Sequence, residues 1–222
     1  MCGRFVQITD LREVGKIFQA TVEARLQPNY NVAPRQPIAV LMEEGKRKIM
    51  EMQWGLIPHW AKDAAIANKL INARSETLAE KPSFRDSFKS RRCLIIADGF
   101  YEWQSLGGIK RPYFIFMKDK QPFAMAGVYD RWKDHEGKTV TSCTIVTTEA
   151  NEFMKPLHHR MPVIIAPKDY ALWLDPAAKD SAKLAALLKP WDAKNMEAYE
   201  VRAMVNSPVN NTSNCIEPID IP

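Results

Sequence analysis

The sequence contains no apolar run of about 18 residues, the length that a membrane-spanning helix needs. Its first residues include Arg4, Asp10 and Arg12, charged side chains that would interrupt the apolar region of a signal peptide. We therefore expect a cytoplasmic protein that makes no membrane contact. The sequence also has no internal repeat, no low-complexity region and no linker long enough to separate two domains. We expect residues 1–222 to form a single domain that acts as a monomer.

Cysteine is scarce, and its spacing excludes two common uses of this residue. The four cysteines lie far apart and form no C-x-x-C pair: Cys2, Cys93, Cys143 and Cys215. In a cytoplasmic protein this pattern indicates free thiols instead of disulfides or a metal cage. His158 and His159 point in opposite directions on an extended chain, and no other His or Cys lies near them in the sequence. We therefore expect no metal site and no cofactor.

Short apolar runs separated by tight turns predict an antiparallel β core. Strands are expected over residues 37–42, 48–56, 93–97, 112–118, 122–129, 141–148 and 163–166. Apolar residues at helical spacing predict helices over residues 10–20, 81–92, 167–174 and 178–188. Residues 206–222 are expected to end in an extended tail. The fold class that follows is α+β, with helices at the periphery of the core.

The second residue, Cys2, has two interpretations. A residue as small as cysteine at this position allows Met1 to be removed, which leaves a free α-amine and a thiol on adjacent carbons. The two groups titrate near ~8 and ~8.5, so both are partly nucleophilic at neutral pH. Such a 1,2-aminothiol condenses with an aldehyde, first to an imine and then to a thiazolidine ring. The alternative is that Cys2 is a small buried hydrophobic residue.

Three more polar residues are candidates for chemistry. Glu102 lies between aromatic residues on an expected strand, where an apolar environment would raise its pKa and suit it to acid–base catalysis; the alternative is an exposed strand glutamate. Asn72 shares a face with Arg74 on an extended segment, which is also the pattern of a polar strand edge. His158 suits the role of acid, base or electrostatic stabiliser.

Aromatic and basic side chains suggest contacts with nucleic acid, which the formal net charge of +5 permits. Trp54 and Trp60 flank a glycine and a proline, and their rings could stack on bases or pack in the core and a turn. The most basic stretch, residues 81–92, includes Arg85 and carries phenylalanines at i,i+4 spacing. Its cations could contact phosphates or form a solvated helix face.

The chain resembles the SOS response-associated peptidase (SRAP) family, which includes the YedK-like abasic site processing proteins, over essentially its whole length. The resemblance rests on separated motifs: Met-Cys-Gly-Arg-Phe at 1–5, Tyr-Asn-Val-Ala-Pro at 30–34, Trp-Gly-Leu-Ile-Pro at 54–58, Asn-Ala-Arg-Ser-Glu-Thr at 72–77, Asp-Gly-Phe-Tyr-Glu-Trp at 98–103, His-His-Arg-Met-Pro at 158–162 and Val-Asn-Asn at 209–211. It implies a single domain with an antiparallel β-barrel-like core. It also implies a covalent reaction with abasic sites in single-stranded DNA, which shields the lesion during the DNA damage response.

The resemblance assigns a role to each candidate residue. Cys2 becomes the nucleophile that forms the thiazolidine after the protein removes its own Met1, and Asn72 positions the N-terminus and the sugar. Glu102 becomes the acid–base that assists sugar opening, and His158 stabilises the opened sugar. The residues expected to contact DNA are Arg4, Asn31, Pro34, Trp54, Trp60, Arg74, Arg85, Arg160 and Asn210. Arg4 and Arg74 are further expected to hold phosphates and to lower the thiol pKa.

Three functions therefore compete. The first is an enzyme that cross-links itself to abasic sites through Cys2 and cleaves its own N-terminus. The second is a noncovalent reader of single-stranded or modified DNA, which would bind with steep salt dependence and without need of Cys2. The third is a cysteine peptidase that acts on other proteins with Cys2 and His158 as nucleophile and base.

Overall fold

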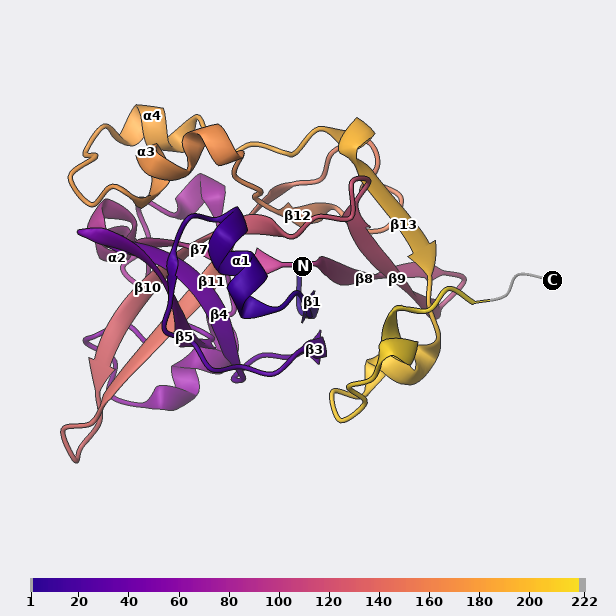
Figure 1. Cartoon of the computed structure of the whole chain (residues 1–222), viewed down its shortest axis with the longest axis horizontal. Coiled ribbons are helices and arrows are strands. Elements are labelled where there is room, and N and C mark those ends of the chain that lie inside the picture. The colour runs from indigo at the N-terminus through magenta and orange to yellow at the C-terminus, as the bar shows by residue number, and fades with distance from the viewer. Residues whose placement is uncertain (1, 220–222) are drawn as a thin grey trace.

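A computed structural model describes residues 2–219, in which five strands close into a barrel (Figure 1). The strands are β4 (Pro37–Glu44), β5 (Lys46–Trp54), β7 (Arg92–Ala97), β10 (Phe123–Lys133) and β11 (Thr139–Glu149). Neighbours pair antiparallel in the order β11-β10-β7-β4-β5. The barrel closes where β5 returns to β11, with Trp54 beside Cys143. This contact is parallel, so the expected barrel-like α+β fold is confirmed with one parallel seam.

A second sheet lies beside the barrel and carries the N-terminal strand (Figure 1). Its strands are β13 (Met196–Glu200), β9 (Ile109–Met117), β8 (Gly99–Leu106), β1 (Phe5–Gln7) and β3 (Asn29–Val32), in that order across the sheet. All of its neighbours are antiparallel. The first strand of the chain is therefore an inner strand of this sheet, with a hydrogen-bonded neighbour on each side.

Short elements complete the fold. The helices are α1 (Leu11–Ile17), α2 (Arg85–Ser90), α3 (Tyr170–Leu174) and α4 (Ser181–Ala185), with 3-10 turns at Ala64–Lys69, Ser75–Thr77, Pro167–Asp169, Ala193–Asn195, Ala203–Asn206 and Ser213–Ile216. Three further short strands are β2 (Thr21–Val22), β6 (Asn72–Arg74) and β12 (Arg160–Pro162). Within residues 2–219, no helix has the length and apolar character needed to cross a membrane.

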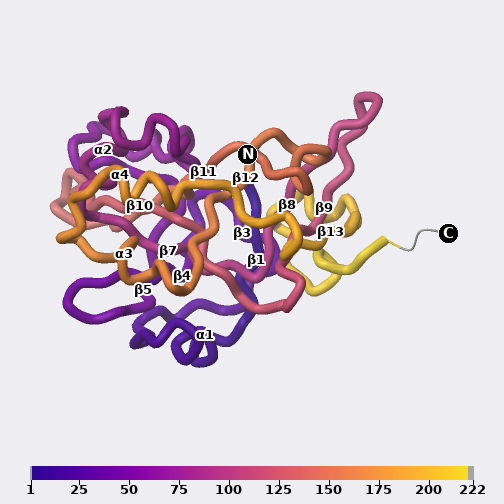
Figure 2. The backbone as a smooth tube through the Cα atoms, turned by 90° about the horizontal axis from the view of Figure 1, so that it is seen from above, coloured from indigo at the N-terminus to yellow at the C-terminus, as the bar shows by residue number. Residues whose placement is uncertain are grey.

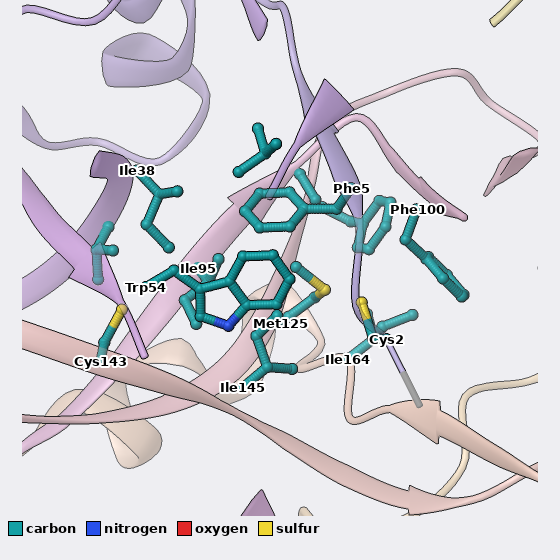
Figure 3. Close-up of a cluster of buried hydrophobic side chains, with 14 of the residues drawn as sticks. Cys2, Phe5, Ile38, Trp54, Ile95, Phe100, Met125, Cys143, Ile145 and Ile164 are labelled. Carbon is teal, nitrogen blue, oxygen red and sulfur yellow. The ribbon is translucent and has the colours of Figure 1, made fainter. Parts of the chain in front are cut away.

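Alternation along the strands divides the core into two layers. On β7, Cys93 and Ile95 join the cluster that contains Cys2 and Trp54, drawn in Figure 3. Leu94, between them, points the other way and joins a cluster that includes buried side chains of all four helices. The helices thus cover one face of the strands, whereas the N-terminal segment packs against the other.

The sequence predicted the long hairpins well and the later segments less well. The strands expected over residues 37–42 and 48–56 form the β4–β5 hairpin, whose turn places Gly45 at φ +75. The strand expected over residues 163–166 is wrong, because β12 precedes it and only Ile164 makes an isolated bridge. The expected extended tail is wrong at Ser213–Ile216, which form a 3-10 turn, whereas Pro218 is extended and bridges Val201; residues 220–222 lie outside the described part.

Gly99, the first residue of β8, allows the second sheet to pack closely. A Cβ at this position would lie 2.7 Å from the carbonyl oxygen of Ile115 and still closer to the ring of Phe114. We expect Gly99→Ala to lower the free energy of unfolding by about 1–3 kcal/mol, because a backbone oxygen cannot rotate away. Urea denaturation measures the change, with Ser105→Ala at an exposed position of β8 as the control. Equal free energies of unfolding for the two variants would show that β8 and β9 can move apart at Gly99 without loss of stability.

Candidate active site

The N-terminal segment enters the protein as a strand and is held there by backbone and side-chain hydrogen bonds. Phe5 of β1 lies between Val32 of β3 and Phe100 of β8. One step before the strand, the carbonyl oxygen of Arg4 accepts a hydrogen bond of 2.9 Å from the backbone N–H of Tyr101. These contacts fix the path of the chain that leads to Cys2.

Cys2 itself is completely buried, with 0% of its surface exposed. Its carbonyl oxygen accepts a hydrogen bond of 2.8 Å from the side-chain amide of Asn72. Figure 3 draws its thiol within the same cluster of apolar side chains as Phe5, Phe100 and Ile164. The structure shows features of both interpretations of Cys2. The residue is buried, as a core residue would be, and its carbonyl oxygen is held by a polar side chain, as a site residue would be.

Burial sets the protonation state of the Cys2 thiol. Loss of hydration raises its pKa well above the ordinary value, and the charge of Glu102 raises it further. The net shift is upward, contrary to the expectation that arginine side chains lower this pKa, and Arg4 lowers it only through its backbone. Arg4 Nη1 donates instead to Asn31 Oδ1 at 2.7 Å and to the carbonyl oxygen of Val205 at 2.8 Å. The thiol is consequently neutral at pH 7 until a nearby base accepts its proton.

Glu102 is the carboxyl group whose negative charge raises the pKa of the Cys2 thiol. It lies on β8 opposite Tyr113, and only 3% of its surface is exposed. Burial raises its pKa above the usual range of a glutamic acid, as the aromatic neighbours predicted. A carboxyl group with a raised pKa can both donate and accept a proton near neutral pH.

Asn72 and Arg74 reach the site from β6, which pairs in parallel with β11. Ala73 between them is buried, so their side chains share the opposite face. Asn72 Oδ1 is buried and has no hydrogen-bond partner among the described residues. Arg74 is exposed. The predicted shared face is thus present, with the amide directed at the N-terminal segment and the guanidinium open to solvent.

His158 lies just before β12 and is half-buried. The backbone N–H of Arg160 donates to His158 Nδ1 at 2.9 Å, which favours the neutral tautomer with its proton on Nε2. Burial and, to a smaller extent, the adjacent charge of His159 lower the pKa of His158 from 6.5 to about 4. The imidazole therefore stays uncharged at physiological pH, which leaves it less suited to act as a base than the sequence suggested.

Arg160, expected on the DNA surface, is instead bound within the protein. Its guanidinium forms a two-pronged ion pair with Glu76, at 2.5 and 3.0 Å, and donates to the carbonyl oxygen of Thr147 at 2.6 Å. The hydrogen bond from Arg160 holds the pKa of Glu76 below its usual range. The ion pair connects β12 to the segment that follows β6, and so fixes the position of His158 relative to that of Asn72. The alternation that begins at Asn72 includes Glu76, but sequence analysis did not predict that its carboxylate pairs with Arg160.

Two other expected DNA contacts are wrong because the side chains are inaccessible. Asn31 is 0% exposed, and its amide donates to three carbonyl oxygens of the C-terminal segment, including that of Asn210 at 2.7 Å. Trp54 is also 0% exposed. Its ring lies edge-on to that of Phe5, with 5.1 Å between the ring centroids, and its N–H donates to the carbonyl oxygen of Ile71. Asn31 therefore holds the C-terminal segment in place, and Trp54 fills the barrel.

The remaining residues that were expected to contact DNA differ in how exposed they are and in where they lie relative to the site. Trp60 is 48% exposed, which leaves its ring open to a ligand, whereas Pro34 and Asn210 are partly buried. Arg85 is exposed on α2, but this helix lies on the far side of the barrel from β8 in both views (Figures 1 and 2). Arg85 is therefore not brought to the site. Among residues 2–219, no group of three or more His, Cys, Asp or Glu side chains could hold a metal ion.

A closed barrel with a buried Cys2, hydrogen-bonded to Asn72 and within electrostatic reach of Glu102, defines a class of protein with an N-terminal cysteine site. The model of the family described as SOS response associated peptidase (SRAP) matches residues 1–208. The chain belongs to this family, as its motifs predicted.

Individual relatives agree with that assignment. The abasic site processing protein YoqW of Bacillus subtilis is 46% identical over 222 residues, covering 98% of this chain and 99% of the relative. The abasic site processing protein HMCES of Gallus gallus is 34% identical over an alignment that covers 90% of this chain and 68% of the relative. A crystal structure of a protein from Bacteroides thetaiotaomicron matches with a TM-score of 0.91 at 30% identity, covering 98% of this chain and 100% of that one.

The low pKa of His158 predicts a pH dependence of stability. The unfolded chain binds a proton at His158 as pH falls through 6.5, whereas the folded chain resists protonation until about pH 4. This contribution to stability is complete above pH 6.5 and is lost as pH falls toward 4. We therefore expect His158→Gln to lose less stability than the wild type between pH 7 and 4.5 in urea denaturation.

An NMR titration of the imidazole provides the direct measurement, with an expected midpoint near 4 for His158. His135→Gln, at an exposed position, serves as the control variant for the stability series. A midpoint at or above 6.5 would contradict the neutral imidazole.

Proposed function

We propose that this protein processes abasic sites in single-stranded DNA by forming a covalent cross-link through Cys2. The observation that carries the proposal is the placement of a buried Cys2, held by Asn72, within electrostatic reach of the carboxyl group of Glu102. Relatives named abasic site processing proteins, one of them similar over nearly its full length, supply the substrate class.

The reaction begins with the ring-opened abasic sugar, which carries an aldehyde at C1′. The α-amine of Cys2 adds to this carbon, and loss of one water gives an imine. The thiol then adds across the C=N bond, with sulfur joining the carbon and a proton passing to nitrogen, which closes a thiazolidine. The amine is free only after hydrolysis of the peptide bond between Met1 and Cys2, which consumes one water. We assign this cleavage to the protein itself; Met1 lies outside the described residues.

Glu102 supplies the proton transfers that these steps need. The raised thiol pKa means that a free thiolate is rare at pH 7, so ring closure needs a base in contact with the thiol. A buried carboxyl group with a raised pKa can donate a proton to the departing hydroxyl and then accept the thiol proton. The raised pKa of Glu102 makes its carboxylate a stronger base than an exposed glutamate, which suits it to accept the thiol proton as sulfur adds to the imine.

His158 and Asn72 have supporting roles. Because Nδ1 accepts from the Arg160 N–H, His158 carries its proton on Nε2, from which it would donate to an oxygen of the opened sugar. Because this imidazole is neutral at pH 7, it acts as a hydrogen-bond donor and not as a cation. Asn72 Nδ2 fixes Cys2, while its buried Oδ1 can orient the amine or the sugar.

The DNA partner would bind on the solvent side of this site. Exposed Arg74 suits a phosphate and exposed Trp60 suits a base, and Pro34 and Asn210 border the N-terminal segment. We further propose that the protein acts as a monomer, in the cytoplasm. Arg4 is partly exposed and stays a proposed phosphate contact, although its Nε is buried and its Nη1 binds within the protein.

The two alternatives are less well supported. A noncovalent reader would use Trp54 as a stacking surface, but its ring lies inside the barrel. A peptidase that cleaves other proteins would use His158 as the base for Cys2, but an imidazole whose pKa is lowered to about 4 is a poor acceptor of the thiol proton. Trp60 and Arg74 alone still allow noncovalent binding, which would show a steep salt dependence that a Cys2 variant retains.

We expect the protein without Met1 to form an adduct with a single-stranded oligonucleotide containing one abasic site, and this adduct should survive denaturing electrophoresis. Cys2→Ala removes the sulfur and should abolish the thiazolidine adduct. Cys215→Ala, at a buried cysteine of a different cluster, is the matched control and should cross-link normally. Equal cross-linking by Cys2→Ala and the control would refute the proposal.

We also expect Glu102→Gln to slow cross-linking by at least about 10²-fold, because the amide cannot relay protons. The rate is measured by quenching the reaction at intervals under saturating DNA, so that weaker binding does not contribute. Glu80→Gln, at an exposed glutamate, is the control and should react at the wild-type rate. An unchanged rate in Glu102→Gln would assign the proton transfers to another group.

A further inference from the structure

The β8–β9 hairpin extends from the site as a ladder of paired side chains. Three cross-strand pairs follow one another along it: Glu102 with Tyr113, Gln104 with Arg111 and Leu106 with Ile109. Residues two apart on a strand share a face, so Leu106 lies on the same face as Glu102. At about 3.3 Å per residue, Leu106 lies roughly 13 Å along the strand from Glu102.

Hydrogen bonds of the intervening residues show where each face of the hairpin is directed. Gln104 Nε2 donates to the carbonyl oxygen of Pro156, at 3.2 Å, in the segment that leads into His158. Trp103, on the opposite face, donates to Asn206 Oδ1 in the C-terminal segment. The face that carries Glu102 and Leu106 is therefore the face directed toward the His158 segment.

The end of the hairpin is apolar and unprotected. Leu106 is 60% exposed and Ile109 is 64% exposed. Gly107 and Gly108 form the turn with φ values of +58 and +83, and Figure 2 shows this hairpin projecting from the body of the protein. The other large exposed hydrophobic residues of the described chain are isolated in the sequence: Ile17, Trp60 and Val209. Leu106 and Ile109 instead form a cross-strand pair that contributes little to the core.

The charge around this pair suits a polyanion. Lys110 and Arg111 follow the turn, and residues 104–111 contain no acidic side chain. Lys110 is exposed, whereas Arg111 Nη1 lies 3.6 Å from Glu200 Oε2 on β13. A basic hairpin with an apolar end fits DNA, because the cations meet phosphates while the aliphatic side chains meet base faces.

We propose that Leu106 and Ile109 pack against an exposed base face of the DNA that flanks the abasic site. The distance of roughly 13 Å from Glu102 corresponds to about four stacked bases at ~3.4 Å each. The end of the hairpin would thus contact a base about four nucleotides away from the lesion, on one side of it. This inference rests on the proposed function for the position of the lesion, but it concerns binding and needs no covalent step.

The test measures noncovalent binding with a tetrahydrofuran analogue of the abasic site, which has no aldehyde. Fluorescence anisotropy compares oligonucleotides with two and with eight nucleotides on the 5′ side, and then on the 3′ side, at one salt concentration. On the side that the hairpin reaches, the double variant Leu106→Ser/Ile109→Ser should bind the long flank about tenfold more weakly than the wild type. It should bind the short flank equally well.

Control variants separate the contact from general effects. Ile17→Ser removes an exposed aliphatic residue on α1 and should leave both affinities unchanged. Leu106→Tyr keeps a surface that can stack on a base and should keep the long-flank affinity. Equal affinities of the wild type and the double variant for both long-flank DNAs would overturn the proposal. A flank effect without cross-linking to a true abasic site would uphold this contact and refute the proposed reaction, whereas cross-linking without a flank effect would do the reverse.

Discussion

The hydrogen bond from Asn72 to the carbonyl oxygen of Cys2 joins the two parts of the protein on which the site depends. Asn72 belongs to β6, which pairs with β11 of the barrel, whereas Cys2 leads into β1 of the second sheet. The N-terminal segment thus bridges the two sheets at their junction. A reactive group at a chain end would ordinarily be mobile. Here the end is an inner strand with a side-chain anchor, so the position of Cys2 is set by the whole fold.

Burial of this junction determines the chemistry as well as the geometry. It raises the pKa of the Cys2 thiol and of the Glu102 carboxyl group, and it lowers the pKa of His158 to about 4. In each case the neutral form is favoured because the charged form loses hydration. A carboxyl group with a raised pKa can hold a proton in one step and release it in another. The proposed reaction needs such transfers, since imine formation, water loss and ring closure each move a proton.

Local patterns predicted most of the barrel, but not how it closes or what fills it. The β4–β5 hairpin follows from two apolar runs around Gly45, whereas the parallel contact between Trp54 and Cys143 depends on strands far apart in the sequence. The same limit applies to the site. Motifs identified Asn72 and Glu102, but the burial of Asn31 depends on carbonyl groups of the C-terminal segment, which no local pattern encodes. The raised pKa of the Cys2 thiol and the lowered pKa of His158 were missed for the same reason, because desolvation is a property of the folded chain, whereas the raised pKa of Glu102 was predicted from its aromatic neighbours.

Mass spectrometry of the cross-linked peptide tests the central claim most directly. After reaction with abasic DNA and digestion with trypsin and nuclease, the account predicts the adduct on the peptide Cys2-Gly3-Arg4. Its mass should equal that of the peptide plus the residual sugar fragment minus one water, as thiazolidine formation requires. An adduct on a lysine, or a cross-linked N-terminal peptide that still begins with Met1, would contradict the account.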